Sequence, residues 1–208
     1  MRAMSPAPAL RFADVSRRFG RLRVLQRLSG EVHAGGVLFV TGRNGCGKST
    51  LLRCLAGLLA PDSGTIDLRL NGAPLGIAER RRSVGYVAPD LTFYDELTAG
   101  ENLEFFARLR RVGVGPSIEL AQWLGLPLER PVAVLSSGMR QRLRWLFALL
   151  ALPALLLLDE PFQNLDQRGE EQLRELLREH LAAGGLAVVA SPAPLSIFHV
   201  EQELCLDR

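Results

Sequence analysis

The sequence predicts an α/β fold with a largely parallel sheet. Short continuous apolar runs, typical of strands buried on both faces, lie at residues 37–40, 154–158 and 186–190. Segments with apolar residues at helical spacing lie between them, notably residues 49–59 and 166–183. Strand and helix that alternate over this length indicate a layered α/β domain.

The N-terminal part is expected to form strands at residues 10–15, 24–32 and 36–40. The last of these runs directly into a glycine-rich loop. The helix at residues 49–59 follows, and the sequence Pro61-Asp-Ser-Gly64 ends it. Two further strands are expected at residues 65–70 and 83–87, joined through a turn at Asn71-Gly72.

From Thr98 to about Trp145 the pattern becomes helical. Ser136 or Ser137 is expected to cap a helix that extends to about Leu150. The remaining expected elements are a strand at residues 154–158, a helix at 166–183 and a strand at 186–190. Length favours one domain over residues 1–208, and we expect a helical subdomain within it at about residues 91–145.

Composition excludes several classes of protein. The chain has 208 residues, 48% of them hydrophobic, and a formal charge of +3, which argues against disorder. The longest apolar run, residues 145–158, contains Pro153 and is too short to span a bilayer, so membrane association is expected to need a partner. Three cysteines without metal-ligand spacing favour a reducing cytoplasm.

Arginines cluster at residues 80–82, 108–111 and 140–144. We interpret these clusters as solvated helix or loop faces. A nucleic-acid-binding protein would show one basic stripe and a recognition module, and neither is visible in the sequence. Nucleic acid is therefore not an expected partner.

Lys48 is the only lysine among 25 Lys and Arg side chains. It lies in Gly42-Arg-Asn-Gly-Cys-Gly-Lys-Ser49, which fits the phosphate-loop pattern G-x-x-x-x-G-K-S/T at every fixed position. A compact ammonium fits a tight phosphate-binding loop better than a guanidinium does. The order strand, loop, helix is the context that this motif requires.

The loop predicts a nucleotide phosphate site. Backbone amides and the helix N-terminus would surround the phosphates, with Lys48 reaching the β- and γ-phosphates and the Ser49 hydroxyl holding Mg²⁺. The residues expected to bind the nucleotide here are Gly42, Asn44, Gly45, Cys46, Gly47, Lys48, Ser49 and Thr50.

Asp159 and Glu160 end the apolar run at residues 154–158. A carboxylate at the end of a buried strand can reach the Mg²⁺ beside a phosphate loop, so Asp159 is a candidate metal ligand. Glu160 is a candidate general base that orients or deprotonates the attacking water.

Between these motifs lies Leu135-Ser-Ser-Gly-Met-Arg-Gln-Arg142. With its flanking motifs, the chain resembles the ATP-binding subunits of ABC transporters, whose signature is LSGGQ followed by basic residues. The resemblance covers essentially the whole chain. It implies a P-loop NTPase core with a mainly parallel sheet, N-terminal antiparallel strands and an inserted helical subdomain.

The resemblance also implies specific roles and partners. Ser136, Ser137 and Gly138 would act on the ATP of a second subunit in a homo- or heterodimer. Phe19 matches the aromatic residue that stacks on adenine, and Asp166, in Gln163-Asn-Leu-Asp166, matches a residue that contacts the partner subunit. An integral membrane permease would hold the chain on the cytoplasmic face of the plasma membrane, with residues 94–111 as a docking surface.

Among ABC ATPases, the chain resembles the short haem-exporter type of cytochrome c maturation. Its length, the sequence Leu97-Thr-Ala-Gly-Glu-Asn-Leu103 and the sequence Asp159-Glu-Pro-Phe162 carry this narrower resemblance. Exporters of drugs, polysaccharides or antibiotics use similar ATPases, so the cargo stays open.

Two positions depart from the family pattern. A glutamine that senses Mg²⁺ usually follows the strand that holds Gly85-Tyr-Val, and here Pro89 or Asp90 falls at that place. Asp90 could still give an oxygen to Mg²⁺, directly or through water. Pro192 occupies the position of a histidine that contacts the γ-phosphate, and it cannot donate a hydrogen bond. We therefore expect ATP binding with slow turnover.

The main hypothesis is an ATPase that powers export through a separate membrane subunit. The alternative is a catalytically weakened, nucleotide-gated regulatory subunit of a heteromeric transporter, which Pro192 favours and Glu160 opposes. A soluble ABC protein of translation or DNA repair is a third reading. Such proteins resemble tandem or coiled-coil-inserted chains, and this sequence does not.

Overall fold

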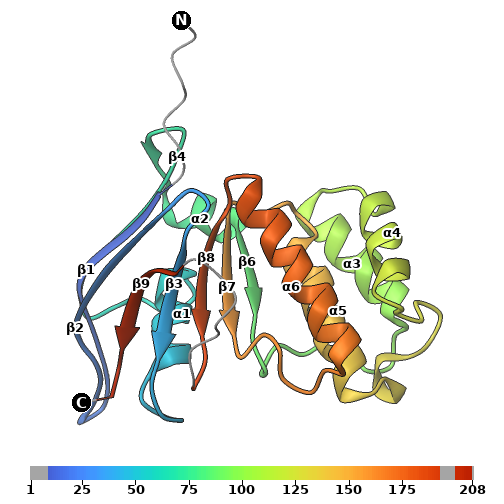
Figure 1. The fold of residues 1–208 in the computed structure, drawn as a ribbon, viewed down its shortest axis with the longest axis horizontal. Coiled ribbons are helices and arrows are strands. Elements are labelled where there is room, and N and C mark those ends of the chain that lie inside the picture. The colour runs from blue at the N-terminus through green and yellow to red at the C-terminus, as the bar shows by residue number, and fades with distance from the viewer. Residues whose placement is uncertain (1–8, 193–199, 208) are drawn as a thin grey trace, which may run out of the picture.

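The computed structural model describes residues 9–192 and 200–207. Its central sheet is parallel and has the order β6-β7-β8-β3-β9 (Figure 1). In that order its strands are β6 (Val84–Val87), β7 (Leu155–Asp159), β8 (Leu186–Ala190), β3 (Val37–Thr41) and β9 (Val200–Cys205). The predicted parallel sheet is confirmed.

The inner strands are apolar because both faces of the sheet are covered. Side chains alternate between faces along a strand. On one face, Val37 and Phe39 of β3 pack in a cluster with residues of α5 (Ser137–Leu149) and α6 (Gln167–Ala182). On the other, Leu38 and Val40 pack with α1 (Lys48–Leu55) and the second sheet.

The second sheet is antiparallel, with the order β2-β1-β4-β5. Its strands are β1 (Ala9–Phe19), β2 (Leu22–His33), β4 (Ser63–Leu70) and β5 (Ala73–Pro74). Leu10, Phe12 and Val15 of β1 face the shared core. The N-terminal antiparallel strands are thus confirmed, and they are longer than predicted.

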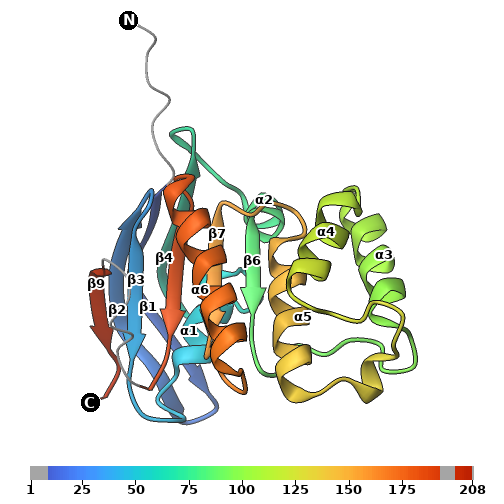
Figure 2. The same ribbon diagram turned by 45° about the vertical axis from the view of Figure 1, so that its right-hand side comes forward.

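Three helices and a short 3₁₀ turn occupy the region predicted to be helical (Figure 2). They are α3 (Ala99–Arg110), α4 (Gly115–Trp123), the turn Val132–Val134, and α5. Thr98 and Glu101 form a capping box that starts α3. These elements share one core with the parallel sheet, and the limits of a separate subdomain stay a prediction.

The Asn71-Gly72 turn exists and the strand predicted at residues 83–87 is confirmed as β6, but the prediction that this turn joins it to the strand at 65–70 is wrong. The turn has positive φ at both residues, 52° and 79°, and joins β4 to the two-residue strand β5. Helix α2 (Ile77–Ser83) then carries the chain to the parallel sheet, where β6 pairs with β7. Three of the four residues of β6 are buried, so the strand fits the central sheet.

Helix α1 ends at Leu55 instead of Leu59. Gly57 takes a positive φ of 73°, and the amides of Leu58 and Leu59 both turn back to the Arg53 carbonyl, at 2.9 and 3.1 Å. A glycine in this conformation is a common helix stop.

Edge strand β9 was not predicted. It pairs with a single neighbour, β3, and alternates half-buried with exposed residues. Its sequence, Val-Glu-Gln-Glu-Leu-Cys, lacks the continuous apolar run that marked the inner strands.

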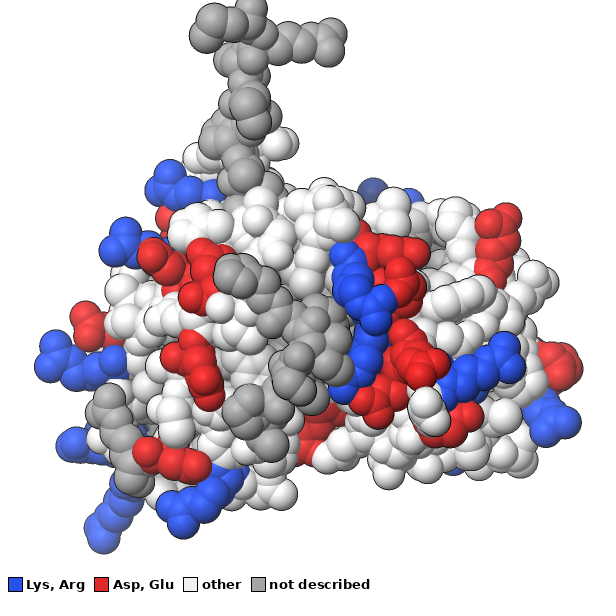
Figure 3. Space-filling view, in the orientation of Figure 1, with Lys and Arg blue, Asp and Glu red and all other residues white. Residues whose placement is uncertain are grey.

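The arginine clusters are not uniformly solvated, so that interpretation is wrong in part. Arg80 is buried beside Gly57, with only 7% of its surface exposed. Charged side chains of both signs gather along α6 (Figure 3). Arg178 pairs with Glu175 at the surface, while Arg174, which pairs with Glu170, has only 12% of its side chain exposed. Within residues 9–192 and 200–207, no helix has the length and apolarity needed to cross a membrane.

Candidate functional site

The phosphate loop lies between β3 and α1, as predicted. Gly47 is the residue before the helix and has a φ of 113°. A Cβ there would lie 2.9 Å from the Val24 side chain and 3.0 Å from its carbonyl oxygen. Only glycine fits this backbone and this close approach of β2. The amides that follow belong to the first turn of α1, and backbone N–H groups at a helix N-terminus suit an anion.

Lys48 is held inside the loop. Its Nζ donates to the carbonyls of Gly42, at 2.5 Å, and Arg43, at 3.0 Å. Only 5% of the residue is exposed. The ammonium thus lies next to the backbone that a phosphate would contact, and its long stem is ordered by the loop.

Asp159 lies at the carboxyl end of β7, and 4% of it is exposed. Burial raises the pKa of its carboxyl, while a hydrogen bond from Ser49 and the charge of Lys48 act in the opposite direction. A buried carboxylate beside a hydroxyl is an oxygen donor set that suits a hard cation. Ser49 and Asp159 therefore fit Mg²⁺.

Glu160 follows β7 directly with a left-handed φ of 48°. Its amide donates to the Ala190 carbonyl at 2.9 Å, which ties it to the end of β8. A non-glycine residue in this region of φ is uncommon and marks a constrained backbone. The side chain is half-buried, so it stays accessible from the site.

These groups line one open hollow of about 360 Å³. Phe19, at the end of β1, lines it together with Lys48, Ser49, Asp159 and Glu160. The Phe19 ring is 48% exposed, and the Arg17 guanidinium lies 5.0 Å from its centre. Phosphate-binding, acidic and aromatic groups predicted from distant segments thus meet here; the other lining residues are Val24, Asn44, Gly45, Gly47 and Thr50.

Asp90 does not line this hollow. Its Oδ2 lies 2.5 Å from Nη2 of Arg53 on α1. Its charge still contributes to raising the pKa of Asp159, which places Asp90 near this candidate metal ligand. Direct coordination of Mg²⁺ by Asp90 would compete with the Arg53 ion pair, and it stays a prediction.

The signature residues start α5. Ser136 is its N-cap and accepts a hydrogen bond from the Met139 amide at 3.2 Å. Ser136 and Ser137 are exposed, and a Cβ on Gly138 would lie 2.8 Å from the Asn164 carbonyl oxygen. Of the described residues that line the hollow, none belongs to this segment.

Asp166 bonds within its own chain. It caps α6 by accepting from the Gly169 amide at 3.0 Å, and it pairs with Arg142 of α5. Both contacts lower the pKa of its carboxyl. Its side chain is 66% exposed, so the predicted contact with a partner subunit is sterically open and stays a prediction.

Pro192 is exposed and follows the end of β8, whose neighbours in the sheet are β7 and β3. The Ser191 amide donates to the Val40 carbonyl at 3.1 Å, which anchors the segment before it. His33 pairs with Glu201 at the sheet edge, and His180 bonds to the Leu186 carbonyl. His199 lies outside the described residues.

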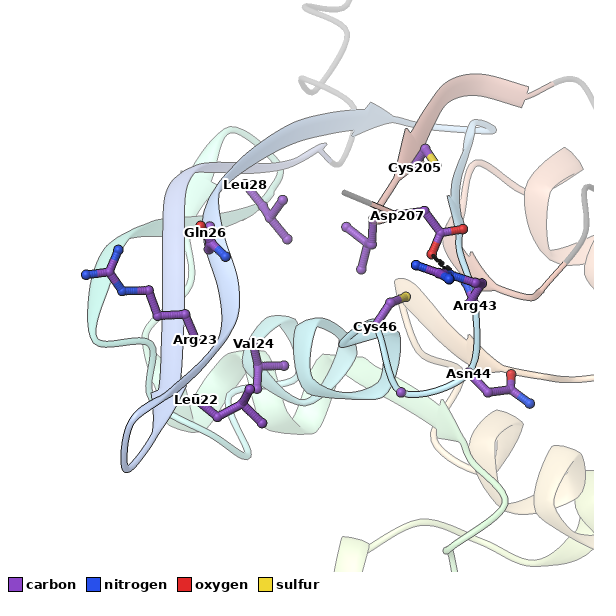
Figure 4. Close-up of a pocket in the computed structure, with 12 residues that line it drawn as sticks. Leu22, Arg23, Val24, Gln26, Leu28, Arg43, Asn44, Cys46, Cys205 and Asp207 are labelled. Carbon is purple, nitrogen blue, oxygen red and sulfur yellow. Dashed lines mark hydrogen bonds and ion pairs between the residues drawn. The ribbon is translucent and has the colours of Figure 1, made fainter.

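The structure adds residues that the sequence did not indicate. Asp207 accepts a hydrogen bond from the Arg43 amide at 2.8 Å, and its carboxylate lies 3.6 Å from Nε of the Arg43 guanidinium (Figure 4). Both line a second pocket, behind the phosphate loop, together with Cys46 and Cys205. Because β9 pairs with β3, the C-terminal segment reaches the loop; a lone aspartate near the chain end carries no motif.

Asp207→Ala is expected to weaken ATP binding about fivefold, because one hydrogen bond to a charged acceptor, worth about 1 kcal/mol at this exposure, no longer holds the loop. Asp207→Asn keeps the acceptor oxygen and serves as the control. Isothermal titration calorimetry with ATP measures both. Equal affinities for the two variants would show that charge, and not the hydrogen bond, matters.

The chain is similar to known ATP-binding proteins. It is 36% identical over 187 residues to the cytochrome c biogenesis ATP-binding export protein CcmA of Rhodopseudomonas palustris, covering 86% of this chain and 88% of the relative. It is 34% identical over 185 residues to the sulfate/thiosulfate import ATP-binding protein CysA of Pectobacterium atrosepticum. That match covers 82% of this chain, which spans only about half, 54%, of the relative's length.

The fold has solved counterparts. A dimeric ATP-binding cassette in a post-hydrolysis state, bound to ADP and Pi, matches with a TM-score of 0.74 and 24% identity over 88% of each chain. The family described as ABC transporter matches residues 25–163, from β2 to the segment after Glu160. With the phosphate loop, Asp159, Glu160 and the signature helix all in place, the chain belongs to the ATP-binding proteins of the ABC transporter family.

Proposed function

We propose that the chain hydrolyses ATP as the energy-supplying subunit of a membrane transporter. The hollow is the observation that best supports this proposal. Its lining brings together the candidate phosphate-binding residues, the candidate metal ligands and the candidate general base beside one aromatic ring. The chemistry is phosphoryl transfer to water, in which positioning and charge stabilisation supply most of the rate.

Each residue then has a defined task. The loop amides and Lys48 hold the β- and γ-phosphates, and Phe19 stacks on the adenine ring. Ser49 and Asp159 would hold Mg²⁺, which neutralises charge on the phosphates when bound. Glu160, which lines the hollow beside Asp159, accepts a proton from the attacking water.

The signature helix supports a dimer. Ser136 and the N-terminus of α5 suit an anion, yet they lie outside the hollow of their own chain. A second cassette arranged head to tail would receive them at its γ-phosphate. The dimeric cassette with 24% identity has the same fold, and a homodimer and a heterodimer are both compatible with these contacts.

A groove between α1, β6, α3 and α5 supports docking of a membrane subunit. It measures about 220 Å³ and is mostly apolar, with Arg81 and Arg110 among its lining. Burial lowers the pKa of Arg110 and raises that of Tyr86 to about 12. We infer that a short apolar helix with an acidic residue docks here. The remaining lining is Ala56, Leu58, Val84, Leu91, Thr92, Phe93, Phe106, Phe147 and Ala148.

For direction and cargo, we propose export in cytochrome c biogenesis. The CcmA relative, which carries that name, matches over 88% of its own length, against 54% for the sulfate/thiosulfate import relative. In this proposal the membrane subunit determines which cargo is transported. Identifying that subunit therefore decides between export in cytochrome c biogenesis and sulfate/thiosulfate import.

Leu58→Arg is expected to lower the fraction of the chain bound to washed membranes of its native host about tenfold. Leu58 lines the groove and is 57% exposed, so the fold tolerates the change. A guanidinium in place of this apolar side chain would have to lose its water against the apolar face of the docking helix, which weakens docking. Sedimentation and crosslinking to an integral membrane protein measure the effect.

Leu152→Arg is the matched control, because Leu152 is 90% exposed and lies outside the groove. Both variants should bind ATP as the wild type does. Equal membrane binding by the two variants would contradict docking in the groove.

Pro192 favours a second function, a nucleotide-gated regulatory subunit that binds ATP without efficient turnover. Hydrolysis by the purified homodimer separates the two functions. Turnover that depends on Glu160 supports the ATPase, and binding without turnover supports the regulatory subunit.

A further inference from the structure

Arg144 joins helix α5 to the loop that follows β6. Its guanidinium donates to the carbonyls of Leu91, at 3.2 Å from Nε, and Pro89, at 3.0 Å from Nη2. The remaining nitrogen, Nη1, donates to Oε1 of Gln141 at 3.0 Å. One planar fork thus fixes two loop carbonyls and one side chain of its own helix, a geometry that lysine cannot reproduce.

Gln141 continues the connection to the general base. Its Nε2 donates to the Pro161 carbonyl at 2.7 Å and lies 3.4 Å from the Glu160 carbonyl. Trp145 of the same helix also donates to the Pro161 carbonyl, at 3.0 Å. Only 3% of Gln141 is exposed. A buried amide is costly unless its hydrogen bonds are made, so these bonds specify one arrangement of the backbone.

The other end of the connection is a wall of the docking groove. Leu91 lines that groove, and Phe147 and Ala148 of α5 line it as well. Asp90, between the two carbonyls that Arg144 holds, pairs with Arg53 of α1. A helix seated in the groove therefore contacts a loop whose backbone is bonded to Arg144.

We propose that Arg144 and Gln141 are positioning residues that tie the groove wall at Pro89–Leu91 to the backbone of Glu160. The path runs from the Leu91 carbonyl through the guanidinium and the buried amide to the Pro161 carbonyl. It sets the position of the general base, and it gives a docked partner a bonded route to the base. The proposal rests on the proposed ATPase function with Glu160 as base.

Arg144→Met and Gln141→Met are each expected to lower kcat of the full chain about tenfold, because a small misplacement of the base slows the chemical step. KM for Mg-ATP should stay within about twofold, because neither residue lines the nucleotide hollow. Arg144→Lys should recover only part of the loss.

The double variant tests whether the two residues act as one path. Breaking a path twice costs no more than breaking it once, so we expect the double variant within about threefold of the slower single variant. Arg178→Met, which removes an exposed arginine of α6 that pairs with Glu175, is the control and should match the wild type. Independent losses that multiply to about 100-fold, or a rise in KM alone, would overturn the proposal.

Fluorescence gives a readout that does not need hydrolysis. In a Trp123→Phe background, Trp145 is the only tryptophan, and it reports the Pro161 carbonyl directly. Arg144→Met should shift its emission, Arg144→Lys should shift it less, and Arg178→Met should leave it unchanged. An unshifted spectrum for Arg144→Met refutes the path. A shifted spectrum with a wild type that binds ATP but does not hydrolyse it refutes only the proposed ATPase function.

Discussion

Glu160→Gln is expected to slow ATP hydrolysis about 10²- to 10⁴-fold, the range for loss of a general base. The change keeps the size and shape of the side chain but removes the group that accepts a proton from water. ATP affinity should stay within about twofold, because the proposed phosphate contacts come from the loop and Lys48 and not from Glu160. Single-turnover hydrolysis of radiolabelled ATP, with a parallel binding titration, measures both quantities.

The control for this substitution is Glu119→Gln. Glu119 is an exposed glutamate of α4, far in the sequence from the hollow and outside its lining. It should hydrolyse ATP at the wild-type rate. If Glu160→Gln retains more than about a tenth of that rate, another group is the base and the assignment fails.

Pro192→His is expected to raise the single-turnover rate about 10- to 100-fold, which approaches the value of one restored transition-state donor. Pro192 is exposed and follows the anchored end of β8, so an imidazole can be placed there without repacking the core. The gain should appear in kcat and not in KM, because the proposed contact with the γ-phosphate would form during the reaction.

Pro192→Ala separates two causes. It removes the ring that fixes the backbone but adds no donor, so we expect it to behave like the wild type. A similar gain from alanine would assign the effect to backbone freedom. A wild type that already turns over at about 10 s⁻¹, an ordinary enzyme rate, would show that proline at this position does not slow hydrolysis.

The inner strands and the phosphate loop could be predicted from local sequence. The runs at β3, β7 and β8 are apolar because each strand is covered on both faces, and that requirement shows directly in composition. The motif requires glycine at position 47, because the positive φ of Gly47 and the close approach of Val24 to its Cα leave no room for a side chain. Asp159 and Glu160 follow from their place at the end of a buried strand.

Edge strand β9 and the strand pairing could not be predicted in the same way. Because β9 lies at the sheet edge, only alternate residues are half-buried and few of them need to be apolar. Its polar sequence is therefore hard to recognise as a strand. The turn at Asn71-Gly72 was visible, but a turn shows only that the chain reverses, and burial decided that β6 joins the parallel sheet.

The sequence by itself determined the phosphate loop, the carboxylates at the end of β7, the signature at the start of α5 and the class of fold, because each is a local pattern of residues. Tertiary structure alone decided that Asp207 braces the loop, that Asp90 pairs with Arg53, and that Arg144 and Gln141 bind the backbone on both sides of α5. The physical reason is that these contacts join residues far apart in the chain, and most of them end on backbone atoms, which every residue type carries alike.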